Sequence, residues 1–203
     1  GGLAPGIGQR RVAQPALADD QAHAELLHER FLFEQRFKVS VRVAHPVTGE
    51  VRVASMEATP DAFVKVSAWV EAEQRRRVFP IVIEVDRDTE EQVVFREKVA
   101  KLYAFATSET YERVSGARSV NIAFFVQAPR RNPSQRLAEL LTWTERELGQ
   151  RQLAHDAVSF SYCALDPATT PPEALLLGPS WFHPFSATPH ALIDLSPATE
   201  GGV

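Results

Sequence analysis

The sequence predicts an α/β fold with a mixed central β-sheet flanked by helices. One observation is the run of residues 78–85, Val-Phe-Pro-Ile-Val-Ile-Glu-Val, which is almost continuously apolar. Such a run is typical of a strand that is buried on both faces, so we expect it at the centre of the sheet. The other observation is that predicted helices and strands alternate in the second half of the chain. That order requires crossover connections and favours helices on both faces.

The first half of the chain carries one helix signal and then strand signals. In residues 18–37 the apolar positions fall near helical spacing after Asp19-Asp20, a pair able to cap a helix. Residues 38–44 and 50–54 alternate polar and apolar side chains on either side of a His-Pro-Val-Thr-Gly turn, which is typical of two strands that can form a hairpin. A further strand is expected from Asp61 onward, ahead of the central one.

Four segments of the second half alternate as helix, strand, helix, strand: residues 89–107, 119–126, 134–149 and 159–165. Apolar side chains recur at helical spacing along the first of them, and Asp88 or Thr89 is placed to cap it. Asn132-Pro133 marks the start of the second helix. These segments complete the predicted sheet and its helical layers.

The length of 203 residues, of which 44% are hydrophobic, supports one good core and is too short for two ordinary domains. We expect residues 1–18 to be a flexible lead-in or linker remnant, residues 19–165 to form the α/β domain, and residues 166–203 to be a Pro-rich C-terminal tail. Within that tail, residues 181–185 read Trp-Phe-His-Pro-Phe. This aromatic island is expected to dock onto the body, with presentation to another protein as the alternative.

Composition excludes several classes. The longest apolar runs are far shorter than a bilayer requires, and the N-terminus lacks the apolar core of a signal peptide, so a soluble, cytoplasmic protein without a membrane partner is expected. The single cysteine, Cys163, rules out an internal disulfide and a Cys-based zinc site, and is expected to be a core residue. Neither a Gly-rich phosphate loop nor a Gly-x-Ser-x-Gly turn occurs, which leaves nucleotide-driven and serine-hydrolase chemistry unsupported.

Charge leaves the question of nucleic acid open. The formal net charge is −4, which provides no overall attraction to DNA. Arginines cluster at residues 75–77 and 130–131 and could form local basic patches.

Acidic residues near the expected strand ends form the candidate site. Hydrolysis of a phosphodiester with Mg²⁺ or Mn²⁺ needs hard oxygen ligands beside the phosphate. Asp61 and Glu84 can share an ion if their strands are adjacent in the sheet. Because side chains alternate along a strand, Asp86 lies on the same face as Glu84 and can join them. Lys98 follows on the next helix.

Each of these residues also has a purely structural interpretation. Asp61 and Glu84 can form turn hydrogen bonds or ion pairs with arginines, and Asp86 can belong to a helix-capping loop. Lys98 can extend from the flank of its helix and pair with Glu91 or Glu97. Similarly, two acids of the first predicted helix, Glu25 and Glu29, either reach the same site or belong to a solvated face.

Three stretches together resemble a known superfamily: Thr59-Pro60-Asp61, the strand ending Ile83-Glu84-Val85-Asp86, and the helix carrying Lys98. They are similar to the PD-(D/E)XK nuclease-like superfamily and, within it, to the plasmid replication-relaxation proteins. The resemblance covers residues 18–165 and is strongest over residues 59–103. It implies a restriction-endonuclease-like core, and Mg²⁺ or Mn²⁺ held by Asp61 and Glu84 with help from Asp86.

The chain departs from that pattern at one position. The superfamily usually has lysine where this sequence has Asp86, but some members carry the lysine on the next helix, which makes Lys98 the candidate by resemblance. The family also commonly has a winged-helix DNA-binding module ahead of this domain. Too few residues precede the first predicted helix for one, so the resemblance implies a fragment or a shortened member.

Two functions follow as hypotheses. In the first, the chain is a nuclease-like domain that acts on plasmid or mobile-element DNA in replication, relaxation or mobilisation, with Asp61, Glu84, Asp86 and Lys98 as its catalytic residues. The alternative is an inactive module of the same fold that recruits a DNA-processing protein. Asp86 and the net acidic charge favour the second hypothesis, whereas two strand-end acids followed by a lysine-bearing helix favour the first.

Overall fold

The computed structural model describes residues 27–33, 35–44, 51–117, 119–153 and 158–196. Its centre is a five-stranded sheet in the order β1-β4-β5-β6-β7. These strands are β1 (Leu27–Phe33), β4 (Ala62–Val70), β5 (Arg75–Asp86), β6 (Asn121–Val126) and β7 (Ser159–Cys163). β4 runs antiparallel to both of its neighbours, whereas β5, β6 and β7 are parallel. The sheet is therefore mixed, as predicted, with β5 as its middle strand.

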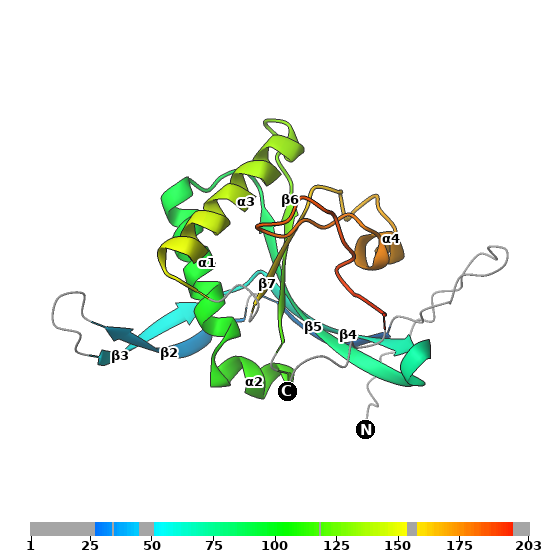
Figure 1. Cartoon of the computed structure of the whole chain (residues 1–203), viewed down its shortest axis with the longest axis horizontal. Coiled ribbons are helices and arrows are strands. Elements are labelled where there is room, and N and C mark those ends of the chain that lie inside the picture. The colour runs from blue at the N-terminus through cyan, green and yellow to red at the C-terminus, as the bar shows by residue number, and fades with distance from the viewer. Residues whose placement is uncertain (1–26, 34, 45–50, 118, 154–157, 197–203) are drawn as a thin grey trace, which may run out of the picture.

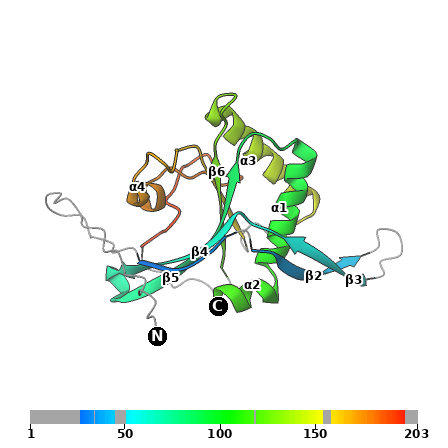
Figure 2. The ribbon, with the colours of Figure 1, turned by 180° about the vertical axis from the view of Figure 1, so that it is seen from behind.

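Helices cover both faces of this sheet (Figures 1 and 2). α1 (Gln92–Ala106) and α3 (Pro133–Gln150) are the crossovers from β5 to β6 and from β6 to β7, and they lie on one face with the short α2 (Glu109–Ser115). The opposite face carries α4 (Pro172–Leu177) and the loops of the C-terminal segment.

A separate two-stranded sheet extends from the side of the molecule (Figure 1). It consists of β2 (Phe37–Ala44) and β3 (Val51–Ala58), which pair antiparallel. The predicted hairpin is confirmed, although it joins its own sheet rather than the central one. Phe37 at its base stacks on Phe105 of α1, with ring centroids 4.5 Å apart, so the hairpin is fastened to the helical face.

Alternation along β5 divides the molecule into two apolar cores. Val82 faces the helices and packs in the cluster that contains Phe95 and Phe124. Its neighbour Ile81 faces the other way, into the cluster that contains Trp181. Since Glu84 lies two positions beyond Val82, its side chain is on the face covered by α1 and α3.

The C-terminal segment packs against the sheet in the way expected for its aromatic island. Trp181 is fully buried, and its indole N–H donates to the carbonyl of Leu175 at 2.5 Å. Backbone bridges join Phe182 to Tyr162 of β7 and Trp181 to His190. Residues 181–185 are thereby attached to the body of the same chain. Cys163 is buried, as the sequence predicted.

Three local predictions were wrong or incomplete. The helix predicted over residues 18–37 is contradicted at residues 27–33, where the chain forms β1 against the otherwise open edge of β4. The predicted Asp19-Asp20 cap and residues 1–18 lie outside the described residues. Backbone pairing with β4 outweighs the helical spacing of a few apolar side chains. Neither Asp88 nor Thr89 caps α1, whose N-cap is Glu91 without a side-chain bond. The short α2 and α4 were not predicted.

None of the helices in the described ranges has the length and apolar character needed to cross a membrane.

Candidate functional site

The structure brings Asp61 and Glu84 together at one edge of the sheet. Glu84 lies near the C-terminal end of β5, and Asp61 immediately precedes the adjacent β4. The register pairs Ala62 with Ile83, so Asp61 stands beside Glu84 where the ladder ends. An Oδ2 atom of Asp61 accepts the backbone N–H of Val85 at 2.7 Å, which fixes its orientation. The two acids thus stand side by side at the ends of adjacent strands, as their proposed cooperation requires.

Lys98 reaches this pair from α1. Its Nζ lies 3.3 Å from Oε2 of Glu84 and 2.5 Å from Oε1 of Glu90, a residue of the loop between β5 and α1. The structural interpretation of Lys98 had named Glu91 or Glu97 as its partner, and that choice was wrong. One ammonium therefore serves two carboxylates at the strand end, with a third carboxylate, that of Asp61, nearby.

Glu84 has the most perturbed acid–base chemistry of the cluster. Its residue is 2% exposed, and this burial raises the pKa of its carboxyl from the ordinary 4.5 to about 7. The Lys98 ammonium lowers this pKa in part, while the negative charges of Asp61 and Glu90 raise it further. Burial also acts against the charge of Lys98, but the two glutamates outweigh it and raise the pKa of the amine. Glu84 thus changes charge near neutral pH beside a fixed cation.

Asp86 lies on the predicted face but is engaged elsewhere. Its Oδ2 and Oδ1 accept from Nε and Nη2 of Arg136 on α3, both at 2.8 Å, and both side chains are buried. The same guanidinium donates to the carbonyl of Glu90 at 3.0 Å and lies 4.9 Å from the ring of Trp143. Asp86 therefore anchors α3 to the end of β5, and its carboxylate is not shared with Lys98.

The side chains of this site offer the type of donor atom that a divalent cation binds. Asp61, Glu84 and Glu90 offer carboxylate oxygens, the ligands that Mg²⁺ and Mn²⁺ prefer. One of them, Oε2 of Glu90, is buried without a hydrogen-bond partner, an arrangement that normally indicates a missing neighbour. Among the described residues no three His, Cys, Asp or Glu side chains are already grouped to hold a metal. The Lys98 ammonium lies between Glu84 and Glu90 in this arrangement and would have to give way.

Two residues of this cluster escaped the sequence interpretation. Arg136 precedes Leu140 and Trp143 at helical spacing, so the periodicity of α3 could have placed it on the buried face. Glu90 sits in a loop, where no periodic signal exists. Of the two acids assigned to the first predicted helix, Glu29 falls in β1 and Glu25 lies outside the described residues.

Comparison with family models, curated proteins and solved structures found no match to this chain. The chemical interpretation accordingly rests on the cluster itself. A carboxyl that titrates near pH 7 and a lysine beside it are the components from which acid–base and phosphate-binding sites are made.

Proposed function

We propose that this chain is a nuclease-like α/β domain of the PD-(D/E)XK type that acts on plasmid or mobile-element DNA. The observation that carries the proposal is the convergence of Asp61, Glu84 and Lys98 from the start of β4, from β5 and from α1. These are the residues that the resemblance to replication-relaxation proteins identified. A mixed sheet in which Glu84 lies on β5, Asp61 immediately precedes the neighbouring β4 and the lysine follows on the next helix supports the same interpretation.

Each residue has a distinct role in this proposal. Asp61, Glu84 and Glu90 would hold a Mg²⁺ or Mn²⁺ ion, which would polarise the phosphate and lower the pKa of a bound water. The backbone N–H of Val85 holds Asp61 in place. Glu84 must be ionised to act as a ligand, so its proton leaves when the site fills. With an ion in place, Lys98 would be released from the two carboxylates and could orient the phosphate or the attacking water. Asp86 was among the catalytic residues predicted from the sequence, but in this proposal it instead positions α3 through its ion pair with Arg136.

Titration of Mn²⁺ by calorimetry, combined with plasmid nicking in the same buffer, tests the proposal. Asp61→Asn and Glu84→Gln keep the side-chain shapes but remove a ligand charge, and we expect both to lose Mn²⁺ binding and nicking together. Glu97→Gln is the matched control because Glu97 is an exposed acid on the same helix as Lys98. Nicking that survives in both site variants, or that EDTA does not stop, would refute the assignment.

A second candidate keeps the fold without the chemistry: a module that recruits a DNA-processing protein. Two observations favour it. Asp86 stands where the superfamily has its lysine and is neutralised by Arg136, and the described carboxylates are not preassembled around an ion. Under this alternative, the contact between Lys98 and Glu84 is purely structural and holds α1 against the end of β5. Wild-type protein that neither binds Mn²⁺ nor nicks plasmid DNA would favour this function over the first.

A further inference from the structure

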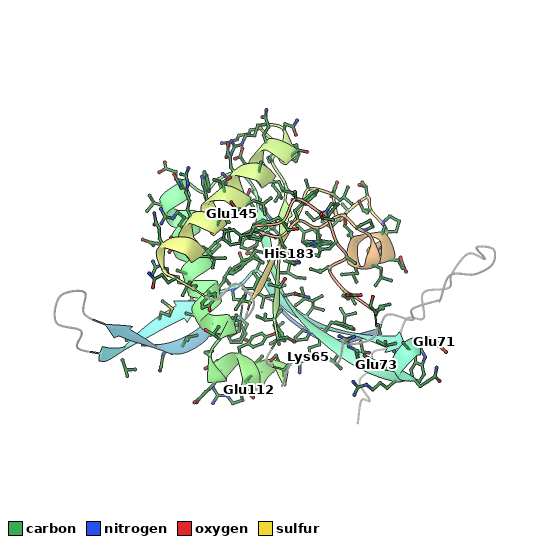
Figure 3. The ribbon with its side chains drawn as sticks, in the orientation of Figure 1. Lys65, Glu71, Glu73, Glu112, Glu145 and His183 are labelled. Atoms are coloured by element: carbon green, nitrogen blue, oxygen red, sulfur yellow. The ribbon has the colours of Figure 1, made fainter. Side chains whose placement is uncertain are left out.

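Two histidines of the C-terminal segment stack on each other where that segment meets the central sheet. The rings of His183 and His190 lie 3.4 Å apart between centroids, at an interplanar angle of 11°. Backbone pairing of Trp181 with His190 brings the two positions together. His183, labelled in Figure 3, contacts the carbonyl group of Phe160 on β7. The stacked pair therefore belongs to the contact between the segment and the sheet.

The surroundings of this pair suit neutral rings. Nδ1 of His183 lies 2.9 Å from the carbonyl oxygen of Phe160, a contact in which Nδ1–H is the donor. Both ring nitrogens of His190 are shielded from solvent and have no hydrogen-bond partner. A proton added to His190 would place a full charge and a second N–H donor in this position, against the face of another imidazole. Burial of an unpaired charge is strongly unfavourable, so the stack favours a neutral His190.

On the cavity side, the pair meets groups of both charges. His183 and His190 line a cavity of about 660 Å³ together with Arg77 and Asp194. The guanidinium of Arg77 repels a charged imidazole. The carboxylate of Asp194 accepts the backbone N–H of Ser196 at 2.8 Å, and Arg77 lowers the pKa of that carboxyl group. This side therefore provides little net attraction for a proton on either ring.

On the sheet side, the neighbours of the pair are mostly uncharged. Ser159 and Ser161 of β7 have hydroxyl oxygens 3.3 and 3.4 Å from Nδ1 of His183. Glu145 of α3 accepts the backbone N–H of Phe185 at 2.8 Å. None of the carboxylates in the described ranges is among the groups that shift the pKa of either imidazole. A proton on the pair is therefore not neutralised by its surroundings.

The pKa values agree with this geometry. Burial lowers the pKa of both imidazoles, and the charge of His183 adds to the effect on His190, whose pKa falls to about 4 although the backbone of Thr188 opposes the shift in part. If the segment opens to water, the pKa returns to the ordinary 6.5. Because the pKa is lower in the closed state, the contact has its full strength above about pH 6.5 and weakens as the pH falls toward 4.

We propose that the stacked pair of His183 and His190 is an acid-sensitive latch that releases the C-terminal segment from the central sheet. Protonation puts like charges on two rings in contact and opposes the pairing of His190 with Trp181. The apolar face that this segment covers includes Ile81 and Phe125. A fall in pH therefore converts a covered face of the sheet into an exposed one. The latch is independent of the carboxylate cluster at the other site.

Hydrogen exchange measured by mass spectrometry on the full chain, at about pH 7.5 and about pH 5, tests the latch. The protection factor of residues 179–193, corrected for the intrinsic exchange rate at each pH, reports how often the segment opens. His190 alone should increase this opening about 30-fold between the two pH values, given a pKa of about 4 when closed and 6.5 when open. Strand β6 serves as the internal reference and should keep its protection.

His190→Phe is the decisive variant, because it keeps a ring that can stack but cannot titrate. The ring nitrogens of His190 have no hydrogen-bond partner, so the substitution removes no bond. The change in protection between the two pH values should be at least tenfold smaller in this variant than in the wild type. His190→Gln provides the same comparison if phenylalanine disturbs the packing. His28→Gln, on the edge strand β1, should behave as the wild type does.

Two results would overturn the proposal: protection of residues 179–193 in the wild type that is the same at both pH values, or an equally large change in the His190 variants. Either would leave the two rings as a purely structural stack. Since Mn²⁺ binding and nicking are measured on other variants, failure of the latch and failure of the proposed nuclease function remain distinguishable.

Discussion

Replacing Glu84 with glutamine should remove a pH-dependent term from the stability of the protein. In the folded chain the pKa of this carboxyl is about 7, against an ordinary value of 4.5. Below about pH 4.5 the carboxyl is protonated in both the folded and unfolded states, so it does not lower the free energy of unfolding. As the pH rises above about 4.5, the unfolded chain releases this proton before the folded chain does. The free energy of unfolding therefore falls with rising pH, and the fall ends once the folded carboxyl has also ionised, above about pH 7.

The size of this term follows from the two pKa values. It amounts to about 3 kcal/mol between pH 4.5 and pH 8, at about 1.4 kcal/mol per pH unit. The wild type should therefore lose that much stability relative to Glu84→Gln over the interval. The other titrating groups are common to both proteins and largely cancel in the difference.

Urea unfolding of both proteins at a series of pH values measures the difference directly. Glu97→Gln serves as the control, because Glu97 is an exposed acid on α1, the helix that carries Lys98, and the difference in stability between this variant and the wild type should stay constant with pH. A difference between Glu84→Gln and wild type that varies by less than about 0.5 kcal/mol over the range would refute the reasoning. It would mean that the carboxyl of Glu84 is not held in the buried environment described.

Three further outcomes are expected. Arg136→Met should destabilise the fold by about 3–5 kcal/mol in urea unfolding, because it leaves Asp86 buried without a partner. Adding Asp86→Leu should recover most of this loss, and a double variant no more stable than Arg136→Met would contradict the reasoning. Trp181→Ala should cost about 3–5 kcal/mol and expose the C-terminal segment to limited proteolysis, whereas an unchanged digestion pattern would show that Trp181 does not hold the segment. Lys98→Met should retain Mn²⁺ binding but reduce plasmid nicking by about 100-fold or more, and undiminished nicking would remove Lys98 from the mechanism.

Several parts of the site were predictable because strand geometry fixes them. Alternation along β5 put Glu84 and Asp86 on one face, and the expected adjacency of their strand with that of Asp61 is what the register shows. The partners of these groups were not predictable. Arg136 reaches Asp86 across 50 positions of sequence, and Glu90 reaches Lys98 from a loop without periodicity. Such pairings depend on how the helices dock, which no local pattern encodes.

The sequence by itself determined which segments are apolar on which face, and hence the mixed sheet, the central position of β5 and the two crossover helices α1 and α3. Only the tertiary structure decided that residues 27–33 form an edge strand, because the open edge of β4 supplies hydrogen bonds that an isolated segment lacks. The same holds for the charge of Glu84 and for the stacking of His183 on His190. Burial and proximity set these properties, and both arise when distant segments pack together.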